Sequence, residues 1–357
     1  MSAARWRSAA MRGALRTLVL GLPLALAGVE PRLPSHWERD GCVVIEMESL
    51  GPAPGWVLER DLAGFSGDGF CRDAGGSEVV ARFVVLTPGR WRMALRNRHE
   101  HPDATLENDC FTSVDGSTPI KTFSSQRGAW TWATRLEDGA GFHEPLYDFD
   151  PGVHELRLRG RSAGFRIDRI RFVREGASDA SAPESLLLPT LPATLARAAV
   201  DGRPGPVLAA AAKLAEDPEA VAAAAAIDER IAGIRATLAT LRDAHPDAAA
   251  DVLAHLAAQC RPVALAKELA AQAAEWAATP AARRAAKARA AVDAIAPIAR
   301  RLAANGVDAR VPATAAAHRQ DLTRILATAR AIAEALPGSS ADVRARTLCA
   351  AIGLTFP

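Results

Sequence analysis

Two kinds of hydrophobic pattern divide the chain. From Gly41 to about Arg174, short runs alternate between apolar and polar residues, and Gly, Pro, Asp and Asn separate the runs. This is the period of a pleated strand. Beyond about residue 190 the chain is rich in alanine and reads as helical. The pattern therefore predicts a β-rich half followed by an all-α half.

One run in the β-rich half has a clear inner and outer face. Trp91, Met93 and Leu95 alternate with arginines and an alanine, which predicts a half-buried strand with Trp91 inside. Many short runs of this kind, with no helical period between them, favour an antiparallel β-sandwich.

The first and last strands carry acidic residues at informative places. A strand at residues 43–47 puts Glu46 on one face with Glu48 beside it, and two like charges at that spacing repel unless a cation lies between them. In the last strand, residues 165–173, Asp168 shares a face with Ile170 and Phe172. If those two side chains enter a core, Asp168 lies at its edge and needs a metal ion or an arginine.

Eight helices are predicted in the second half, and Pro297 should kink or end the sixth. Short connections favour antiparallel hairpins, a bundle or a small solenoid. The predicted helices are 191–200, 206–215, 218–244, 247–259, 263–278, 281–304, 313–336 and 341–350.

The chain begins with the pattern of an export signal. Four arginines precede an apolar run from Leu18 to Ala27 that closes with small residues, which predicts a secretory signal peptide over residues 1–27. An amphipathic first helix is the alternative. The formal charge of the whole chain is +2, and removing those four charges leaves −2, so no basic surface for nucleic acid is expected.

The five cysteines show no CxxC spacing, which argues against a zinc site or a dithiol redox centre. Export permits a disulfide among Cys42, Cys71 and Cys110, but the spacing does not select a pair.

The predicted organisation is a signal peptide at 1–27, a β-sandwich at 41–174, a linker at 175–189 and a helical domain at 190–357. No stretch after the signal peptide is long and apolar enough to predict a membrane span.

Five segments follow one another along the β-rich half: Val44–Glu48, Ser66–Phe70, Thr87–Trp91, Pro151–His154 and Phe165–Ile170. In this order they resemble the landmarks of carbohydrate-binding module families 6 and 35, which are β-sandwich jelly rolls. The segment 107–116 and the following Trp130-Thr-Trp132 also resemble modules of this type in secreted bacterial glycan-utilisation proteins.

The resemblance implies a structural calcium ion held by Glu46, Glu48 and Asp168, with backbone carbonyls completing the shell. The chemistry is reasonable, because calcium takes six to eight hard oxygen ligands. The alternative is that the two glutamates are solvated and that Asp168 pairs with a nearby arginine.

The resemblance also implies a glycan site, for which Trp130 and Trp132 are the best platform candidates because sugar rings offer apolar faces and hydroxyl edges. Burial of one or both tryptophans in the core is the alternative. Two positions depart from the family pattern: Phe70 stands where a tyrosine is frequent, and Arg166 where an asparagine is common. The expected supporting residues are Asn108, Asp109, Arg96 and Arg166.

No catalytic signature surrounds any serine, and no catalytic core is expected. The chain is therefore predicted to be a secreted or periplasmic, non-catalytic carbohydrate-binding protein, with a helical domain that contacts a protein partner. A protein-interaction or cell-envelope scaffold whose sandwich binds no sugar is the alternative.

Overall fold

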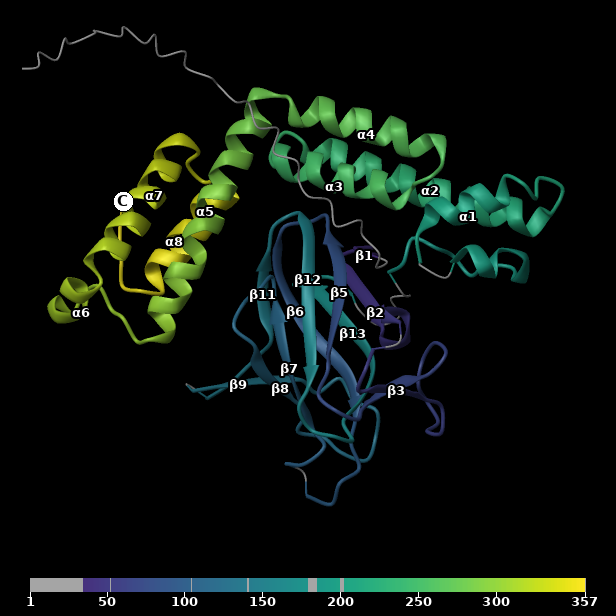
Figure 1. Ribbon diagram of the computed structural model, residues 1–357, viewed down its shortest axis with the longest axis horizontal. Helices are drawn as coiled ribbons and strands as arrows, with labels where there is room; N and C mark the ends of the chain where they lie inside the picture. Colours follow the sequence, from purple (N-terminus) through teal and green to yellow (C-terminus); the bar gives the residue numbers. More distant parts are fainter. Residues whose placement is uncertain are drawn as a thin grey trace, which may run out of the picture.

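The structure is a computed structural model that describes residues 35–51, 53–103, 105–139, 141–178, 185–199 and 202–356. Figure 1 shows a β-sandwich built from the first half of the chain and helices that arch over one end of it. The predicted β-sandwich jelly roll followed by an all-α region is confirmed. The predicted signal peptide lies outside the described residues.

One sheet of the sandwich has seven strands in the order β1-β5-β12-β7-β8-β9-β10. Its pairs are antiparallel except for β1 and β5, which run in parallel. The strands are β1 (Ser35–Trp37), β5 (Glu78–Val85), β7 (Asp109–Val114), β8 (Ile120–Phe123), β9 (Arg135–Asp138), β10 (Gly141–His143) and β12 (Gly152–Gly160).

The second sheet has six strands, in the order β11-β6-β13-β4-β3, and β2 also pairs with β13. All of its pairs are antiparallel. The register of β13 against β6 shifts between Ile167 and Arg169, so Asp168 lies at a bulge. The strands are β2 (Cys42–Glu46), β3 (Trp56–Glu59), β4 (Phe70–Asp73), β6 (Gly89–Arg98), β11 (Leu146–Phe149) and β13 (Arg166–Arg174).

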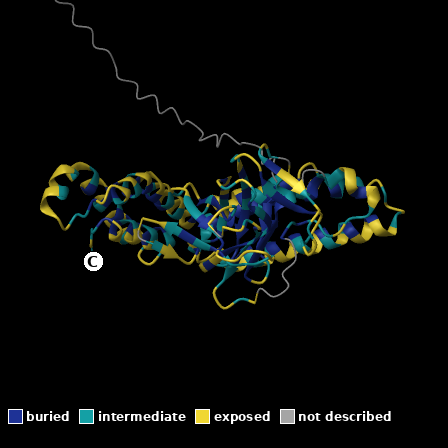
Figure 2. Cartoon of the chain, turned by 90° about the horizontal axis from the view of Figure 1, so that it is seen from below, coloured by how far each residue is buried: buried dark blue, intermediate teal, exposed yellow. Residues whose placement is uncertain are grey.

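The two sheets enclose one hydrophobic core. Phe83 of β5 and Phe172 of β13 are fully buried and stack with ring centroids 4.5 Å apart, which joins the sheets at the centre. Trp91 is buried in the same core, as its alternating strand predicted. Figure 2 shows that buried positions are concentrated in the middle of the molecule.

A second core joins the sandwich to the first helices. Trp37 and Val84 of the sandwich pack in one cluster with residues of α2, α3 and α4. The Trp37 backbone N–H donates to the Ser185 carbonyl at 2.6 Å, so the chain after the sandwich runs beside β1. Arg230 of α2 donates to the Leu187 carbonyl at 3.0 Å. The two halves therefore share buried surface in addition to a covalent connection.

Most of the helices begin with proline in the first turn, where the missing N–H costs nothing. Pro297 lies inside α5, which continues past it to Ala304, and the predicted last long helix is divided at His318. The region 191–200, predicted as α-helix, contains a 3₁₀ helix at Ala193–Ala199. The α-helices are α1 (Pro204–Ala211), α2 (Pro218–Leu241), α3 (Pro246–Gln259), α4 (Ala264–Ala277), α5 (Pro280–Ala304), α6 (Pro312–Ala317), α7 (Arg319–Ala335) and α8 (Ser340–Ala350).

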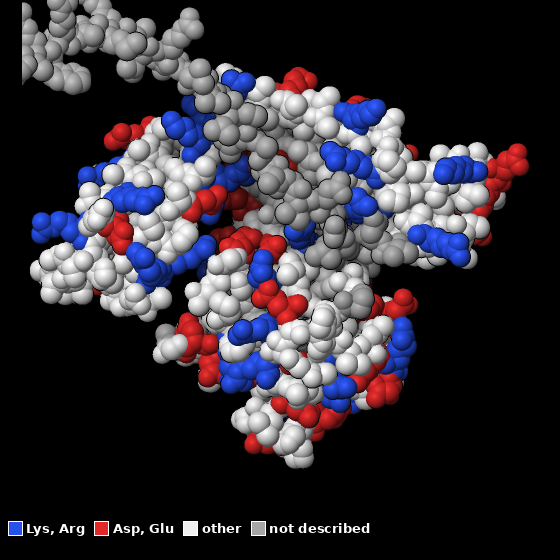
Figure 3. Space-filling view, in the orientation of Figure 1, with Lys and Arg blue, Asp and Glu red and all other residues white. Residues whose placement is uncertain are grey.

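All five cysteines lie in the described part of the chain; each is buried and none forms a disulfide. The disulfide that export would permit is therefore not formed in this structure. No helix among the described residues has the length and hydropathy needed to cross a membrane. On the face shown in Figure 3, acidic and basic side chains are mixed over both parts of the molecule.

Candidate functional site

The outer face of the six-stranded sheet carries arginines and the half-buried Trp132. Along β6, Trp91, Met93 and Leu95 point inward, so Arg92 and Arg96 point outward. The segment 131–134 runs along the edge of β6, where Asn97 and Thr131 form an isolated bridge. Residues of this segment thereby reach the outer face.

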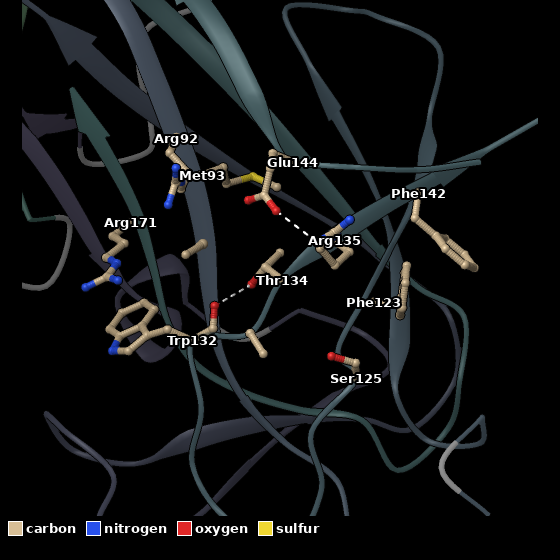
Figure 4. A pocket seen from close by; sticks show the side chains of 12 residues that line it. Arg92, Met93, Phe123, Ser125, Trp132, Thr134, Arg135, Phe142, Glu144 and Arg171 are labelled. Carbon is tan, nitrogen blue, oxygen red and sulfur yellow. Dashed lines mark hydrogen bonds and ion pairs between the residues drawn. The ribbon is translucent and has the colours of Figure 1, made fainter. Parts of the chain in front are cut away.

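An open pocket of about 540 Å³ lies on this face (Figure 4). Trp132 and Arg171 form one side of it, and Phe123 of β8 and Phe142 of β10 form the opposite side. We call this the aromatic pocket. The main residues that line it are Arg92, Met93, Ala94, Phe123, Trp132, Arg135, Phe142, Glu144 and Arg171.

Arginines make the aromatic pocket basic. The Arg171 guanidinium lies 3.9 Å from the centroid of the Trp132 ring, a cation–π contact with the half-buried indole. Arg135 is neutralised by Glu144 at 3.0 Å, whereas the exposed Arg92 has no ion-pair partner among the described residues. Such a pocket offers apolar ring faces together with cationic hydrogen-bond donors.

A second group, the acidic cluster of Glu46, Glu48 and Asp168, surrounds the loop at residues 64–70. The Ser66 hydroxyl shares its one hydrogen between Glu46 at 3.0 Å and Asp168 at 3.1 Å. The Asp68 backbone N–H donates to Glu48 at 2.7 Å. An ideal Cβ at Gly67 would lie 2.0 Å from a Glu48 carboxylate oxygen. With its φ of 61°, this position favours glycine, and a larger residue would also push the Glu48 side chain aside.

Two arginines neutralise part of the acidic cluster. Arg96 pairs with the fully buried Asp168, and Arg169 donates to Glu46 at 2.6 Å. The buried charge of Asp168 is therefore paired with an arginine, one of the two partners expected at the edge of the core. The first predicted strand, 43–47, corresponds to β2, which ends at Glu46. Glu48, expected to continue the face of that strand, lies instead in the 3₁₀ helix Met47–Leu50. The chain turns there, yet both glutamates still reach the same loop.

Burial governs the ionisation of the two glutamates. It raises the pKa of Glu48 to about 7, against the lowering effect of hydrogen bonds from the backbone. Burial also raises the pKa of Glu46, although the Arg169 guanidinium and the Ser66 hydroxyl oppose the shift. Burial therefore disfavours the charged form of both glutamates.

The chemistry of the acidic cluster fits calcium in part. Its donors are hard carboxylate oxygens, and Glu48 Oε2 is buried without a hydrogen-bond partner. Within the described ranges, however, no group of three or more His, Cys, Asp or Glu side chains is already arranged as a metal site. An ion at this loop would need the carboxylates to draw closer together.

The sequence-predicted glycan residues fall into four places. Trp132 lines the aromatic pocket, while Trp130 and Arg96 lie beside the acidic cluster, with the Trp130 indole N–H donating to the Ala63 carbonyl at 3.0 Å. Asn108 and Asp109 are buried, and Asp109 pairs with Arg161. The remaining residue, Arg166, has its Nε 4.0 Å from Glu59. The structure therefore does not bring the six together.

The sequence prediction did not include the other walls of the aromatic pocket. Arg92 and Arg171 were visible in principle, because the period of two places both outside their strands. Phe142, 62% exposed in a strand of three residues, gave no such signal.

No protein-family model matches the chain, and no curated protein matches it. Among solved structures, the chain is similar to a GH26–CBM35 β-(1,4)-mannanase of Podospora anserina, with 15% identity and a TM-score of 0.31 over 43% of this chain and 32% of that chain. It is also similar to a CBM35 of Cellvibrio japonicus Abf62, with 17% identity and a TM-score of 0.27, covering 40% of this chain and 99% of the other. It is similar as well to a CBM35 of Paenibacillus barcinonensis, with 18% identity and a TM-score of 0.28, covering 37% of this chain and 99% of the other.

Proposed function

We propose that the chain is a non-catalytic glycan-binding protein whose aromatic pocket takes a sugar ring that carries a carboxylate. The observation that supports this is the half-buried Trp132 beside Arg92, which has no ion-pair partner in the described part of the chain. An indole face packs against the C–H face of a sugar ring, and a guanidinium binds a carboxylate with two parallel hydrogen bonds. Export of the protein and a protein partner for the helical half remain predictions.

The first test is binding of the full chain to an array that contains uronic-acid glycans and their neutral counterparts. Trp132→Ala is expected to weaken binding about tenfold, and Arg92→Ala is expected to weaken binding of the acidic glycans only. Arg90→Ala is a matched control, because Arg90 is an exposed arginine of the same strand outside the pocket. Failure of the unmodified chain to bind any glycan would overturn the proposal.

We also propose that the acidic cluster takes calcium. The unpartnered Glu48 oxygen and the presence of three carboxylates beside two arginines support this. Calcium is expected to raise the melting temperature of the full chain at pH 8 by about 3 °C, corresponding to about 1 kcal/mol, and a chelator should reverse the rise. Magnesium is the control ion, because it requires octahedral coordination with shorter metal–oxygen distances than calcium does. A melting temperature unchanged by calcium would argue against the site.

A further inference from the structure

We infer that Asn97, which does not line the aromatic pocket, is the residue that positions Trp132 in it. The side chain of Asn97 points into the sandwich from the end of β6 and is 1% exposed. No ligand on the outer face can reach it. Its effect on the pocket is therefore exerted through the segment that carries the indole.

Asn97 holds the chain on both sides of Trp132. Its backbone N–H donates to the Thr131 carbonyl at 2.9 Å, and the Thr131 N–H donates back to the Asn97 carbonyl at 3.0 Å. Its side-chain Nδ2 donates to the Ala133 carbonyl at 3.1 Å. One residue therefore anchors both neighbours of the indole.

The segment has few other attachments. Residues 132–134 belong to no strand, so a regular ladder does not hold them. The Thr131 hydroxyl bonds only within residues 126–133, and the Thr134 hydroxyl bonds the Trp132 carbonyl at 3.2 Å. Thr134 also attaches to β6, because the Leu95 backbone N–H donates to its hydroxyl at 2.9 Å and that hydroxyl lies 3.3 Å from the Leu95 carbonyl oxygen. Removing the Asn97 amide leaves the backbone bridge to Thr131 in place, but it leaves the carbonyl of Ala133 without its donor and loosens the backbone on that side of Trp132.

An amide is the group that this position requires. Nδ2 also donates to the Leu95 carbonyl at 2.8 Å, so two carbonyl oxygens converge on one donor nitrogen. A carboxylate there would face both oxygens with a buried negative charge. Asn97→Asp is thus expected to disturb the segment more than Asn97→Ala, although aspartate has nearly the same shape as the asparagine it replaces.

The positioning role can be tested without any glycan, by ¹⁹F NMR of the full chain labelled with 5-fluorotryptophan. The Trp132 resonance is identified by its loss in Trp132→Phe. In Asn97→Ala we expect this resonance to shift or broaden, while those of Trp37 and Trp276, which lie in the core shared with the helices, stay in place. Ser113→Ala is the matched control, because it removes a buried hydroxyl that bonds the Ser117 carbonyl in the opposite sheet.

The consequence for binding rests on the proposed function. If the pocket binds glycan, Asn97→Ala should weaken that binding about tenfold, as Trp132→Ala does, and Ser113→Ala should leave it unchanged. If the unmodified chain binds no glycan, the proposed function fails while the ¹⁹F result still decides the role of Asn97. Should Asn97→Ala not fold, Asn97→Ser keeps a donor at the site and is examined in its place.

One measurement on the unmodified chain completes the test. The Thr131 amide donates to Asn97, so we expect it to exchange its hydrogen more slowly than the Trp132 amide. An unchanged Trp132 resonance in Asn97→Ala, an equal shift of all tryptophan resonances, or rapid exchange at Thr131 would each overturn the inference.

Discussion

Replacement of Trp37 by alanine is expected to lower the free energy of unfolding by about 3–5 kcal/mol, the usual cost of removing a large buried aromatic side chain. The indole is 1% exposed and lies in the core that joins the sandwich to α2, α3 and α4. Its ring centroid is 5.8 Å from that of His255 on α3, and β1 pairs with β5 beneath it. The cavity would therefore open between the two halves of the protein.

The measurement is chemical denaturation of the full chain combined with hydrogen exchange. Because both halves contribute to this core, exchange should rise in β5 and in α3 together. Trp37→Phe is the matched variant, and it should cost much less, since the Trp37 Nε1 is buried without a hydrogen-bond partner and its loss removes no bond. Faster exchange in only one of the two elements would show that the shared core does not couple them.

The sandwich was predictable because its pattern is local. In β6 the alternation of apolar and polar residues follows the pleat, and Trp91 is buried as that alternation requires. The joint between the halves was not predictable in the same way. The strand Ser35–Trp37 has three residues, too few to show a period, and it is stabilised by Val84 and by helices far along the chain.

In the candidate site, too, some features follow from the local sequence pattern and others only from tertiary packing. The outward position of Arg92 follows from the strand period of β6, but its meeting with Trp132, Phe123 and Phe142 depends on the segment 131–134 and on the packing of β8 and β10 beside the other sheet. Likewise Asp168 was recognised as a charge at the core edge, whereas its bulge and its pairing with Arg96 arise from contacts across the sheet. Sequence spacing identifies the groups, and tertiary packing decides their partners.

Glu48→Gln is expected to stabilise the protein at pH 8 in the absence of calcium by about 2 kcal/mol. Burial raises the pKa of Glu48 from its ordinary value of 4.5 to about 7. Ionising this group is therefore harder in the folded state, which binds the proton more tightly than the unfolded state does. The full shift corresponds to about 3 kcal/mol, and solvent screening at a half-buried side chain reduces it.

The sign of the shift sets the dependence on pH. Between about pH 4.5 and pH 7 the folded state retains a proton that the unfolded state has lost, so the free energy of unfolding falls as the pH rises and then levels above 7. In Glu48→Gln this fall should be smaller, and the two proteins should have similar stability near pH 4.5. Glu100→Gln, at an exposed glutamate, is the control.

Denaturation of each variant from pH 4.5 to pH 8, in chelator and in calcium, distinguishes a buried proton from a metal ligand. A bound cation favours the ionised carboxylate, so calcium should remove the advantage of Glu48→Gln at pH 8 and reverse it at saturation. A gain that persists in calcium would assign Glu48 to the proton alone and contradict its proposed role as a ligand. No gain even in chelator would mean that the Asp68 N–H and the loop around Gly67 stabilise the charge in spite of its burial.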